Sequence, residues 1–184
     1  MTKITTLYGE INNELSKALK QIKLLVCDID GVFSDGRIYL GNDGEELKAF
    51  HTKDGFGIKA LIASGVKVAV ITGRQSTIVQ NRMQALNVTD IIQGQEDKLP
   101  ALTTLAQQYQ LQAQQIAYIG DDIPDLACIK YVGIGVAVQD AHPIICQQAN
   151  YITTLKGGFG AVRELCDIIM QAQNTLNQAA GASI

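Results

Sequence analysis

The sequence predicts an α/β protein built on a doubly wound, Rossmann-like parallel sheet with one projecting β-hairpin. Short apolar runs rich in branched residues alternate with longer segments of helical periodicity along most of the 184 residues. Strands that alternate with helices form parallel sheets with right-handed crossovers. One pair of short apolar segments instead flanks Asn42-Asp43-Gly44, a sequence typical of a tight hairpin turn.

The first third of the chain is expected to hold two helices, one strand and the hairpin. An opening amphipathic helix is predicted by apolar residues at helical spacing, namely Leu7, Ile11, Leu15, Ala18, Leu19 and Ile22. The apolar segment 22–27 is typical of a buried strand. The hairpin is expected within residues 37–50. Asp54 is expected to cap a helix over residues 54–64.

The rest of the chain continues the alternation of strands and helices. Further buried strands are expected at 66–72, 90–94, 115–120, 133–138 and 151–154. Helices are expected at 75–86, from Lys98 to Tyr109, around Pro124 and Asp125, at 142–149 and at 161–174. Residues 1–174 therefore form one domain, and the small, polar tail 175–184 is expected to be mobile.

The composition excludes several classes of function. With 47% hydrophobic and 18% charged residues, the chain can form one soluble domain with a sizeable core. A net charge of -3 gives no basic footprint for nucleic acid. No apolar run approaches the ~20 residues that span a bilayer, so no membrane partner is expected. Four scattered cysteines without Cys-x-x-Cys spacing predict reduced thiols and a cytoplasmic location.

Four polar segments follow predicted strands or open predicted helices. They are Asp28-Ile29-Asp30, Thr72-Gly73-Arg74, Lys98, and Asp121-Asp122 with Asp125. We expect them to meet in one crevice, because the carboxyl ends of parallel strands share an edge of the sheet. Phosphoryl transfer requires such a set: a carboxylate nucleophile, groups that bind phosphate oxygens, and oxygen ligands for a hard divalent cation.

Taken singly, each of these residues has an ordinary structural explanation. Asp-Gly pairs are common in turns, and Thr72 could cap a helix. Lys98 could be a solvated residue of a first helical turn. Asp122 and Asp125 could be acids that face a helix dipole. The order and spacing of the whole set favour a catalytic site over these separate explanations.

The complete set, in this order, resembles the haloacid dehalogenase superfamily of phosphatases over nearly the whole chain. The resemblance implies that Asp28 is the nucleophile that becomes phosphorylated. It also implies that Asp30 is the general acid that protonates the leaving oxygen and then the base that activates water. Dehalogenases of the superfamily lack this second acid, so Asp30 favours a phosphatase.

The same resemblance implies a magnesium site and a phosphate site. The implied Mg²⁺ ligands are Asp28, the backbone carbonyl of Asp30, and Asp121. Either Asp122 or Asp125 would support these ligands from behind. Thr72 and Lys98 match the residues that bind phosphate in the second and third motifs of the superfamily.

A finer resemblance is to the family of 3-deoxy-D-manno-octulosonate 8-phosphate phosphatases of lipopolysaccharide sugar synthesis. The residues that carry it are the hairpin and the segments 28–36, 51–58, 72–74 and 157–164. The implied substrate is anionic at both ends, so it needs cations beyond the phosphate pocket. The candidate substrate-binding residues are Asp30, His51, Thr52, Lys53, Asp54, Gly55, Lys59, Thr72, Gly73, Arg74, Arg82 and Lys98. Arg74 and Arg82 are expected two turns apart on one helix.

The chain has no room for the cap domain that usually gives specificity in the superfamily. Residues 31–71 suffice only for the hairpin and one helix, and residues 98–121 only for a helix and a strand. A capless crevice stays open or is closed by a neighbouring subunit. We therefore expect a homotetramer whose hairpins bury the apolar side chains of Ile38, Tyr39 and Leu40.

Two alternatives remain open from the sequence. One is a capless phosphatase for another sugar-acid phosphate, such as N-acetylneuraminate 9-phosphate, or the free-standing form of the phosphatase-like domain found on some acylneuraminate cytidylyltransferases. The other is a non-catalytic subunit that binds a sugar phosphate. The acid pair and the lysine argue against the second alternative, because a binding protein does not need Asp30.

Overall fold

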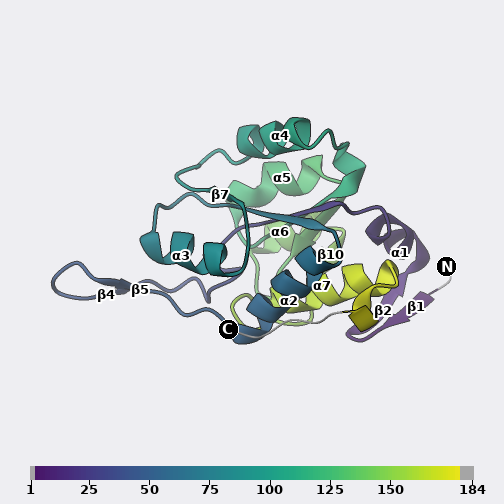
Figure 1. The fold of residues 1–184 in the computed structure, drawn as a ribbon, viewed down its shortest axis with the longest axis horizontal. Helices are drawn as coiled ribbons and strands as arrows, with labels where there is room; N and C mark the ends of the chain where they lie inside the picture. Colours follow the sequence, from purple (N-terminus) through teal and green to yellow (C-terminus); the bar gives the residue numbers. More distant parts are fainter. Residues whose placement is uncertain (1–2, 179–184) are drawn as a thin grey trace.

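Six parallel strands form the central sheet of the computed structural model, which describes residues 3–178 (Figure 1). Their spatial order is β10 (Tyr151–Ile152), β9 (Ile134–Ala137), β8 (Ile116–Gly120), β3 (Leu24–Cys27), β6 (Lys67–Ile71) and β7 (Asp90–Ile92). From β3 the chain runs outward through β6 and β7, then returns to β8 and runs outward through β9 and β10. The predicted doubly wound sheet is confirmed, with its switch point between β3 and β8.

The register of the sheet aligns the carboxyl ends of β3, β6 and β8 side by side. Cys27 at the end of β3 lies opposite Val70 in β6 and Ile119 in β8. The backbone N–H of Asp28 then donates to the carbonyl of Ile119 at 3.0 Å. The loops after these three strands therefore start from one edge of the sheet, where doubly wound proteins bind ligands.

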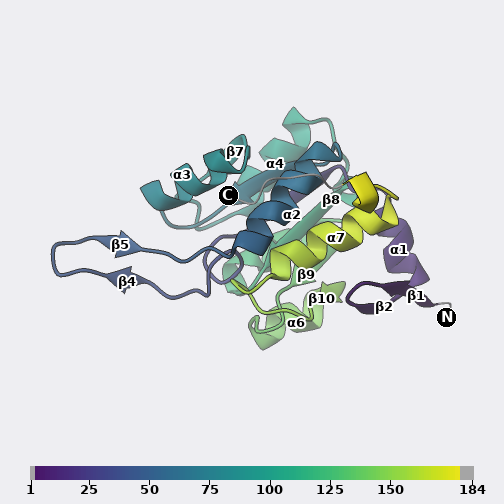
Figure 2. The same ribbon diagram turned by 60° about the horizontal axis from the view of Figure 1, so that its bottom comes forward.

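Helices cover both faces of the sheet, and alternate residues of β3 face the two cores. One layer consists of α1 (Asn13–Leu19), α2 (Thr52–Ala63), α3 (Thr77–Ala85) and α7 (Ala161–Ala172). The other consists of α4 (Leu99–Gln108), α5 (Leu126–Tyr131) and α6 (Pro143–Gln148). Leu25 and Cys27 pack in the first core, and Leu24 and Val26 pack in the second. Figure 2 shows α2 and α7 side by side.

The remaining segments are short. Residues 3–178 also contain three short 3-10 helices, namely η1 (Ala113–Gln115), η2 (Ile123–Asp125) and η3 (Leu176–Gln178). The last of these lies within the predicted tail 175–184, whose residues 179–184 lie outside the described part of the chain. Between residues 3 and 178, no helix combines the length and hydrophobicity that a membrane span requires.

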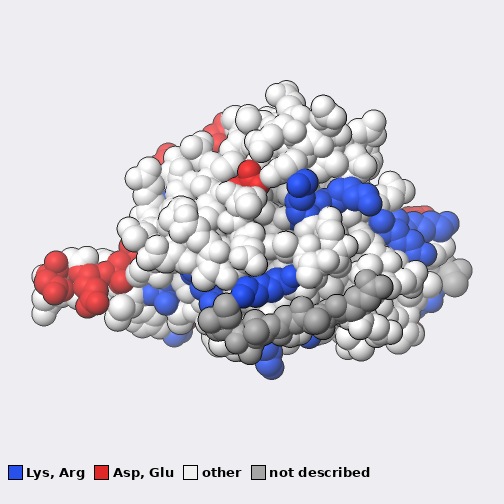
Figure 3. All heavy atoms as spheres, in the orientation of Figure 1, with Lys and Arg blue, Asp and Glu red and all other residues white. Residues whose placement is uncertain are grey.

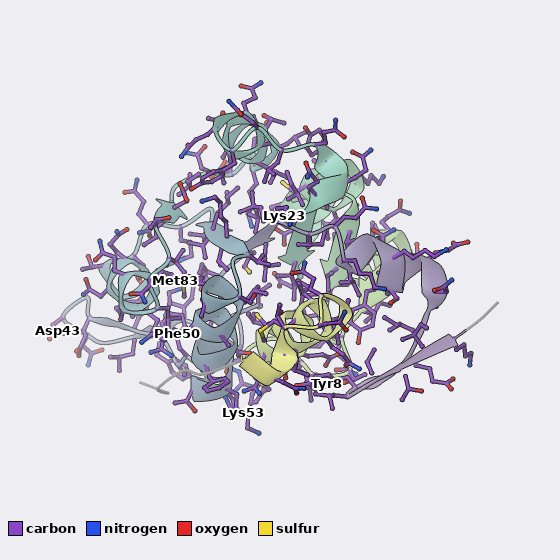
Figure 4. The ribbon with its side chains drawn as sticks, turned by 45° about the vertical axis from the view of Figure 1, so that its right-hand side comes forward. Tyr8, Lys23, Asp43, Phe50, Lys53 and Met83 are labelled. Atoms are coloured by element: carbon purple, nitrogen blue, oxygen red, sulfur yellow. The ribbon has the colours of Figure 1, made fainter. Side chains whose placement is uncertain are left out.

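The prediction of one long opening helix is wrong. Residues 3–12 form an antiparallel hairpin of β1 (Lys3–Thr6) and β2 (Gly9–Asn12), and helix α1 follows. Gly9 turns the chain with a φ of 122°, which glycine adopts readily, and the Asn12 side chain caps α1 by accepting from the Leu15 N–H at 2.7 Å. Tyr8, labelled in Figure 4, ties this hairpin to α7 through a hydrogen bond from its hydroxyl to Asp167 at 2.8 Å.

The one predicted hairpin is confirmed at residues 39–47 and projects from the body of the molecule (Figures 1 and 2). Its strands are β4 (Tyr39–Leu40) and β5 (Glu46–Leu47), which pair antiparallel. The apolar side chains that it exposes are Ile38, Tyr39, Leu40 and Leu47, of which Leu40 is 71% exposed. No cap domain is present among the described residues, since only this hairpin and α2 lie between β3 and β6.

The predicted role of Asp54 as a helix cap is wrong. Helix α2 begins at Thr52, and the His51 ring nitrogen caps it by accepting from the Lys53 N–H at 3.1 Å. Asp54 lies inside the first turn, fully buried, where its carboxylate accepts the N–H of Arg163 at 2.8 Å. The carboxylate thereby joins α2 to α7 instead of capping its own helix.

Glu164 fixes the loop that follows β10. Its carboxylate is fully buried and accepts from the Tyr151 hydroxyl, from the N–H and hydroxyl of Thr154, and from the Leu155 N–H. The loop continues to Gly157, where a side chain would overlap the carbonyl of Gly31. Glu164 therefore supports the backbone that packs against the loop after β3.

We expect Glu164→Gln to lower the free energy of unfolding by about 2 kcal/mol, because the amide nitrogen cannot accept the bonds that Oε2 receives. Urea unfolding of the two proteins measures the difference. Glu14→Gln, on the exposed surface of α1, is the matched control. Equal midpoints for wild type and Glu164→Gln would contradict this role.

Candidate active site

A cavity of about 560 Å³ opens at the carboxyl ends of β3, β6 and β8. The loops after these strands and the start of α4 line it. The predicted residues found there are Asp28, Asp30, Thr72, Gly73, Arg74, Lys98, Asp121, Asp122 and Asp125. The four polar segments that the sequence separates by up to 97 residues (from 28 to 125) thus share one cavity.

Lys98 joins two carboxylates at the floor of the cavity. Its ammonium lies 2.7 Å from Asp28 Oδ1 and 2.7 Å from Asp125 Oδ1. All three residues are buried, with Asp28 6% exposed, Lys98 4% and Asp125 1%. Burial alone would lower the pKa of Lys98, but the two carboxylates together raise it. The lysine is therefore a firmly charged group beside Asp28.

Asp125 supports the site from behind. Its Oδ1 accepts from Lys98 and from the Tyr118 hydroxyl, each at 2.7 Å. Its Oδ2 accepts the backbone N–H groups of Asp121 at 2.9 Å and Asp122 at 3.2 Å. Four donors match the four lone-pair positions of a carboxylate, so Asp125 has none left for a metal ion. Of the two acids left open by the sequence, Asp125 is the one that contacts Lys98 and the backbone of Asp121.

Oxygens of Asp28, Asp121 and Asp125 lie within 4.8 Å of one another. Burial, followed by repulsion from Asp125, raises the pKa of Asp28 to about 6. Burial, followed by repulsion from Asp28, raises the pKa of Asp121 to about 8. Because a divalent cation would relieve this repulsion, the residues present fit a metal held by Asp28 and Asp121. Gly31 is needed beside them, because a Cβ there would overlap the Asp121 carboxylate.

Two residues in the returning arm of the β4–β5 hairpin contact the site without having been predicted. The ammonium of Lys48 forms an ion pair with Asp30 Oδ1 and lies 3.4 Å from Glu46 Oε1. The other Glu46 oxygen lies 3.9 Å from the guanidinium of Arg74. One signal in the sequence could have found them, since residues 46 and 48 point to the same side of a strand, opposite to Leu47.

Thr72, Gly73 and Arg74 form the cavity wall after β6. Thr72 is buried, and its carbonyl accepts from the Gln95 N–H at 3.0 Å. The Arg74 carbonyl accepts from the Gly94 N–H at 3.2 Å, so the loop is tied to the one after β7. Helix α3 begins only at Thr77. Arg74 therefore lies in a loop, and the prediction that it shares a helix with Arg82 is wrong.

The second group of predicted substrate-binding residues does not line this cavity. The group consists of His51, Thr52, Lys53, Asp54, Gly55, Lys59 and Arg82. Arg82 lies against Gly55, where an added Cβ would meet its guanidinium nitrogen at 2.5 Å. Lys53 points away from the body at the start of α2 (Figure 4). Burial raises the pKa of Asp54 to about 6, although the Arg163 N–H opposes the change, and the side chain has no access to solvent.

Comparisons with known proteins place this geometry in a family. A curated relative from Yersinia pestis, the 3-deoxy-D-manno-octulosonate 8-phosphate phosphatase KdsC, is 50% identical over 181 residues, covering 98% of this chain and 97% of the relative. The protein of the same name from Escherichia coli K12 is 44% identical, covering 98% and 96%. The chain belongs to the KdsC family. In addition, residues 86–163 of the chain match the family model of the haloacid dehalogenase-like hydrolases.

Solved structures of the KdsC family share the whole fold. A crystal structure of the Yersinia pestis phosphatase superposes with a TM-score of 0.97 at 49% identity, covering 100% of this chain and 99% of that one. The Moraxella catarrhalis phosphatase superposes with a TM-score of 0.89 at 43% identity, covering 91% and 97%. That structure is a complex with a magnesium ion, a phosphate ion and a KDO molecule. The predicted superfamily and the finer resemblance are both confirmed.

Proposed function

We propose that this protein is a Mg²⁺-dependent phosphatase that hydrolyses 3-deoxy-D-manno-octulosonate 8-phosphate to the free sugar acid and phosphate. The observation that carries the proposal is the cavity in which Asp28, Asp30, Lys98 and Asp121 meet. Support comes from KdsC relatives at 44–50% identity over nearly the full chain. The product would enter lipopolysaccharide synthesis, and the free cysteines agree with a cytoplasmic enzyme.

The reaction proceeds in two displacement steps. An oxygen of Asp28 attacks phosphorus, and the electron pair of the breaking P–O bond goes to the sugar oxygen, which takes a proton from Asp30. Asp30 then removes a proton from water as the water oxygen attacks phosphorus. The bond between phosphorus and Asp28 breaks, which releases phosphate and leaves Asp28 ionised and Asp30 protonated again.

Asp28, Asp121 and the backbone carbonyl of Asp30 would hold Mg²⁺. When bound, the ion neutralises charge on the phosphoryl group and lets two anions approach each other. Lys98 adds a fixed positive charge beside Asp28, and Thr72 with the backbone of Gly73 binds phosphate oxygens. Asp125 keeps Lys98 in place and is not a ligand.

We infer that Arg74 binds the carboxylate of the sugar acid, since its guanidinium is half-exposed at the cavity wall. Among the predicted residues outside this cavity, Asp54 and Gly55 are buried. We infer that the others serve the cavity of a neighbouring chain, namely His51, Thr52, Lys53, Lys59 and Arg82. A homotetramer assembled through the exposed hairpin would bring them there and cover its four apolar side chains. Figure 3 shows the acidic hairpin tip, around Asp43, far from the body of the molecule.

Magnesium is expected to stabilise the protein more at pH 8 than at pH 5.5. The pKa values of Asp28 and Asp121 are raised to about 6 and about 8, above the ~3.9 of an unfolded aspartate. The metal-free folded protein therefore binds more protons than the unfolded chain, so its stability falls as pH rises from about 4 to 8. Mg²⁺ replaces these protons and removes the repulsion that appears when they leave.

Thermal unfolding with EDTA and with excess Mg²⁺, at both pH values, measures this effect. Asp121→Asn removes one ligand and most of the repulsion, so it should abolish most of the difference. A rise in Tm of the same size at both pH values would contradict the assignment of Asp28 and Asp121 as ligands.

The activity itself is tested by phosphate release from a panel of sugar phosphates, with Mg²⁺ and with EDTA. The panel contains 3-deoxy-D-manno-octulosonate 8-phosphate and N-acetylneuraminate 9-phosphate. We expect Mg²⁺-dependent release with a kcat/KM at least ~100-fold higher for the eight-carbon acid, since a misplaced carboxylate loses its ion pair with Arg74. Equal kcat/KM values for the two sugar phosphates would support a phosphatase activity but contradict the proposed substrate.

A further inference from the structure

The carboxylate of Asp30 has one hydrogen-bond partner among residues 3–178, and that partner comes from the hairpin. Lys48 donates to its Oδ1, whereas Asp28 contacts Lys98 and Asp125 receives four donors. Asp30 also precedes Gly31, whose φ of 94° is a conformation that favours glycine. The direction of the Asp30 side chain in the cavity is therefore set by Lys48.

Lys48 in turn is held by its surroundings. Its side chain is 0% exposed, and a fully buried ammonium is unfavourable unless acids face it. Glu46 supplies the second acid at 3.4 Å, and its Oε1 is buried without a hydrogen bond of its own. The other Glu46 oxygen faces Arg74 at 3.9 Å. Charges of alternating sign thus run from Asp30 through Lys48 and Glu46 to Arg74.

We propose that Lys48 is a positioning residue that aims the Asp30 carboxyl at the leaving oxygen, and that Glu46 holds Lys48 in that position. The inference rests on the proposed function, in which Asp30 transfers the proton. It makes the returning arm of the hairpin part of the proton-transfer machinery, although the hairpin also carries exposed apolar side chains.

The leaving group of the substrate separates this role from general support of the site. A sugar oxygen is a poor leaving group and needs the proton from Asp30, whereas p-nitrophenolate leaves without one. The parameter kcat/KM reports the steps up to departure of the leaving group. If the Asp30 carboxyl is no longer held in position, kcat/KM should therefore fall for the sugar phosphate and stay the same for the aryl phosphate.

The experiment compares kcat/KM for 3-deoxy-D-manno-octulosonate 8-phosphate and for p-nitrophenyl phosphate, both with Mg²⁺. Lys48→Met keeps the side-chain volume without the charge, and should lower the ratio of the two values by about tenfold or more. Lys48→Arg should restore part of the ratio. Glu46→Gln should lower it less, and the matched control Glu45→Gln, on an exposed neighbour, should leave it unchanged.

Equal losses for both substrates in Lys48→Met, or no loss for either, would overturn the inference. If Lys48→Met does not fold, as judged by circular dichroism, the ratio of the two kcat/KM values is compared between Glu46→Gln and Glu45→Gln. A lower ratio in Glu46→Gln supports the inference, and equal ratios overturn it. A wild type that releases no phosphate from the sugar phosphate would instead refute the proposed function, and the inference with it.

Discussion

Asp28→Asn is expected to lower kcat by roughly 10⁴-fold or more, because an amide cannot form the phosphorylated intermediate. The substitution keeps the shape of the side chain, and its amide oxygen can still face the Lys98 ammonium that lies 2.7 Å from Asp28. Burial raises the pKa of Asp28 to about 6, which means that its ionised form is unfavourable in the folded protein. Replacing it with a neutral amide is therefore not expected to lower the stability.

Phosphate release measures this loss, with thermal unfolding as the check that the variant is folded. Asp122→Asn is the matched control, since Asp122 caps η2 at the cavity rim and has no part in the two displacement steps. A folded Asp28→Asn protein that keeps a tenth of the wild-type kcat would contradict the assignment of the nucleophile.

Lys98→Met is expected to cost both activity and stability. The variant leaves Asp28 and Asp125 buried without the cation that lies 2.7 Å from each of them. Breaking a buried ion pair by removing one partner costs about 3–5 kcal/mol of unfolding free energy. We also expect kcat/KM to fall by about 10³-fold, since a fixed charge beside the phosphoryl group is lost.

Urea unfolding in EDTA measures the change in stability, and steady-state kinetics with Mg²⁺ measure the change in kcat/KM. Lys130→Met, which removes an exposed cation from α5, is the control and should change neither quantity by much. A Lys98→Met protein with the wild-type unfolding midpoint would show that the two carboxylates do not depend on this lysine.

The central sheet could be predicted because its inner strands β3, β6, β8 and β9 are buried on both faces and therefore appear as continuous apolar runs. The opening helix could not, because Ile4 and Ile11 pair across a hairpin whose turn at Gly9 matters more than the spacing of the apolar residues. The interior position of Asp54 could not be predicted for a related reason. Acids are common caps, but here a carboxylate is used in the interior to accept the N–H of Arg163, 109 residues away.

The residues of the cavity could be predicted because each follows directly on a strand of a parallel sheet or opens a helix, so topology alone brings them together. Spacing along the chain could not separate Asp122 from Asp125. The two acids differ in their contacts, because only Asp125 accepts a hydrogen bond from the Tyr118 hydroxyl, and only the fold shows this contact. The alternation of side chains along a strand could place Glu46 and Lys48 on one side of the hairpin, but only the fold shows that this side faces Asp30.

In the proposed reaction, the phosphoryl group passes through a covalent bond to Asp28. Borohydride reduces an acyl phosphate of aspartate to homoserine, which peptide mass spectrometry locates in the chain. The protein would be mixed with 3-deoxy-D-manno-octulosonate 8-phosphate and Mg²⁺, quenched during turnover and reduced. We predict homoserine at position 28, absent without substrate and absent with EDTA. Turnover that leaves Asp28 unmodified, or homoserine at position 30 or 121, would contradict it.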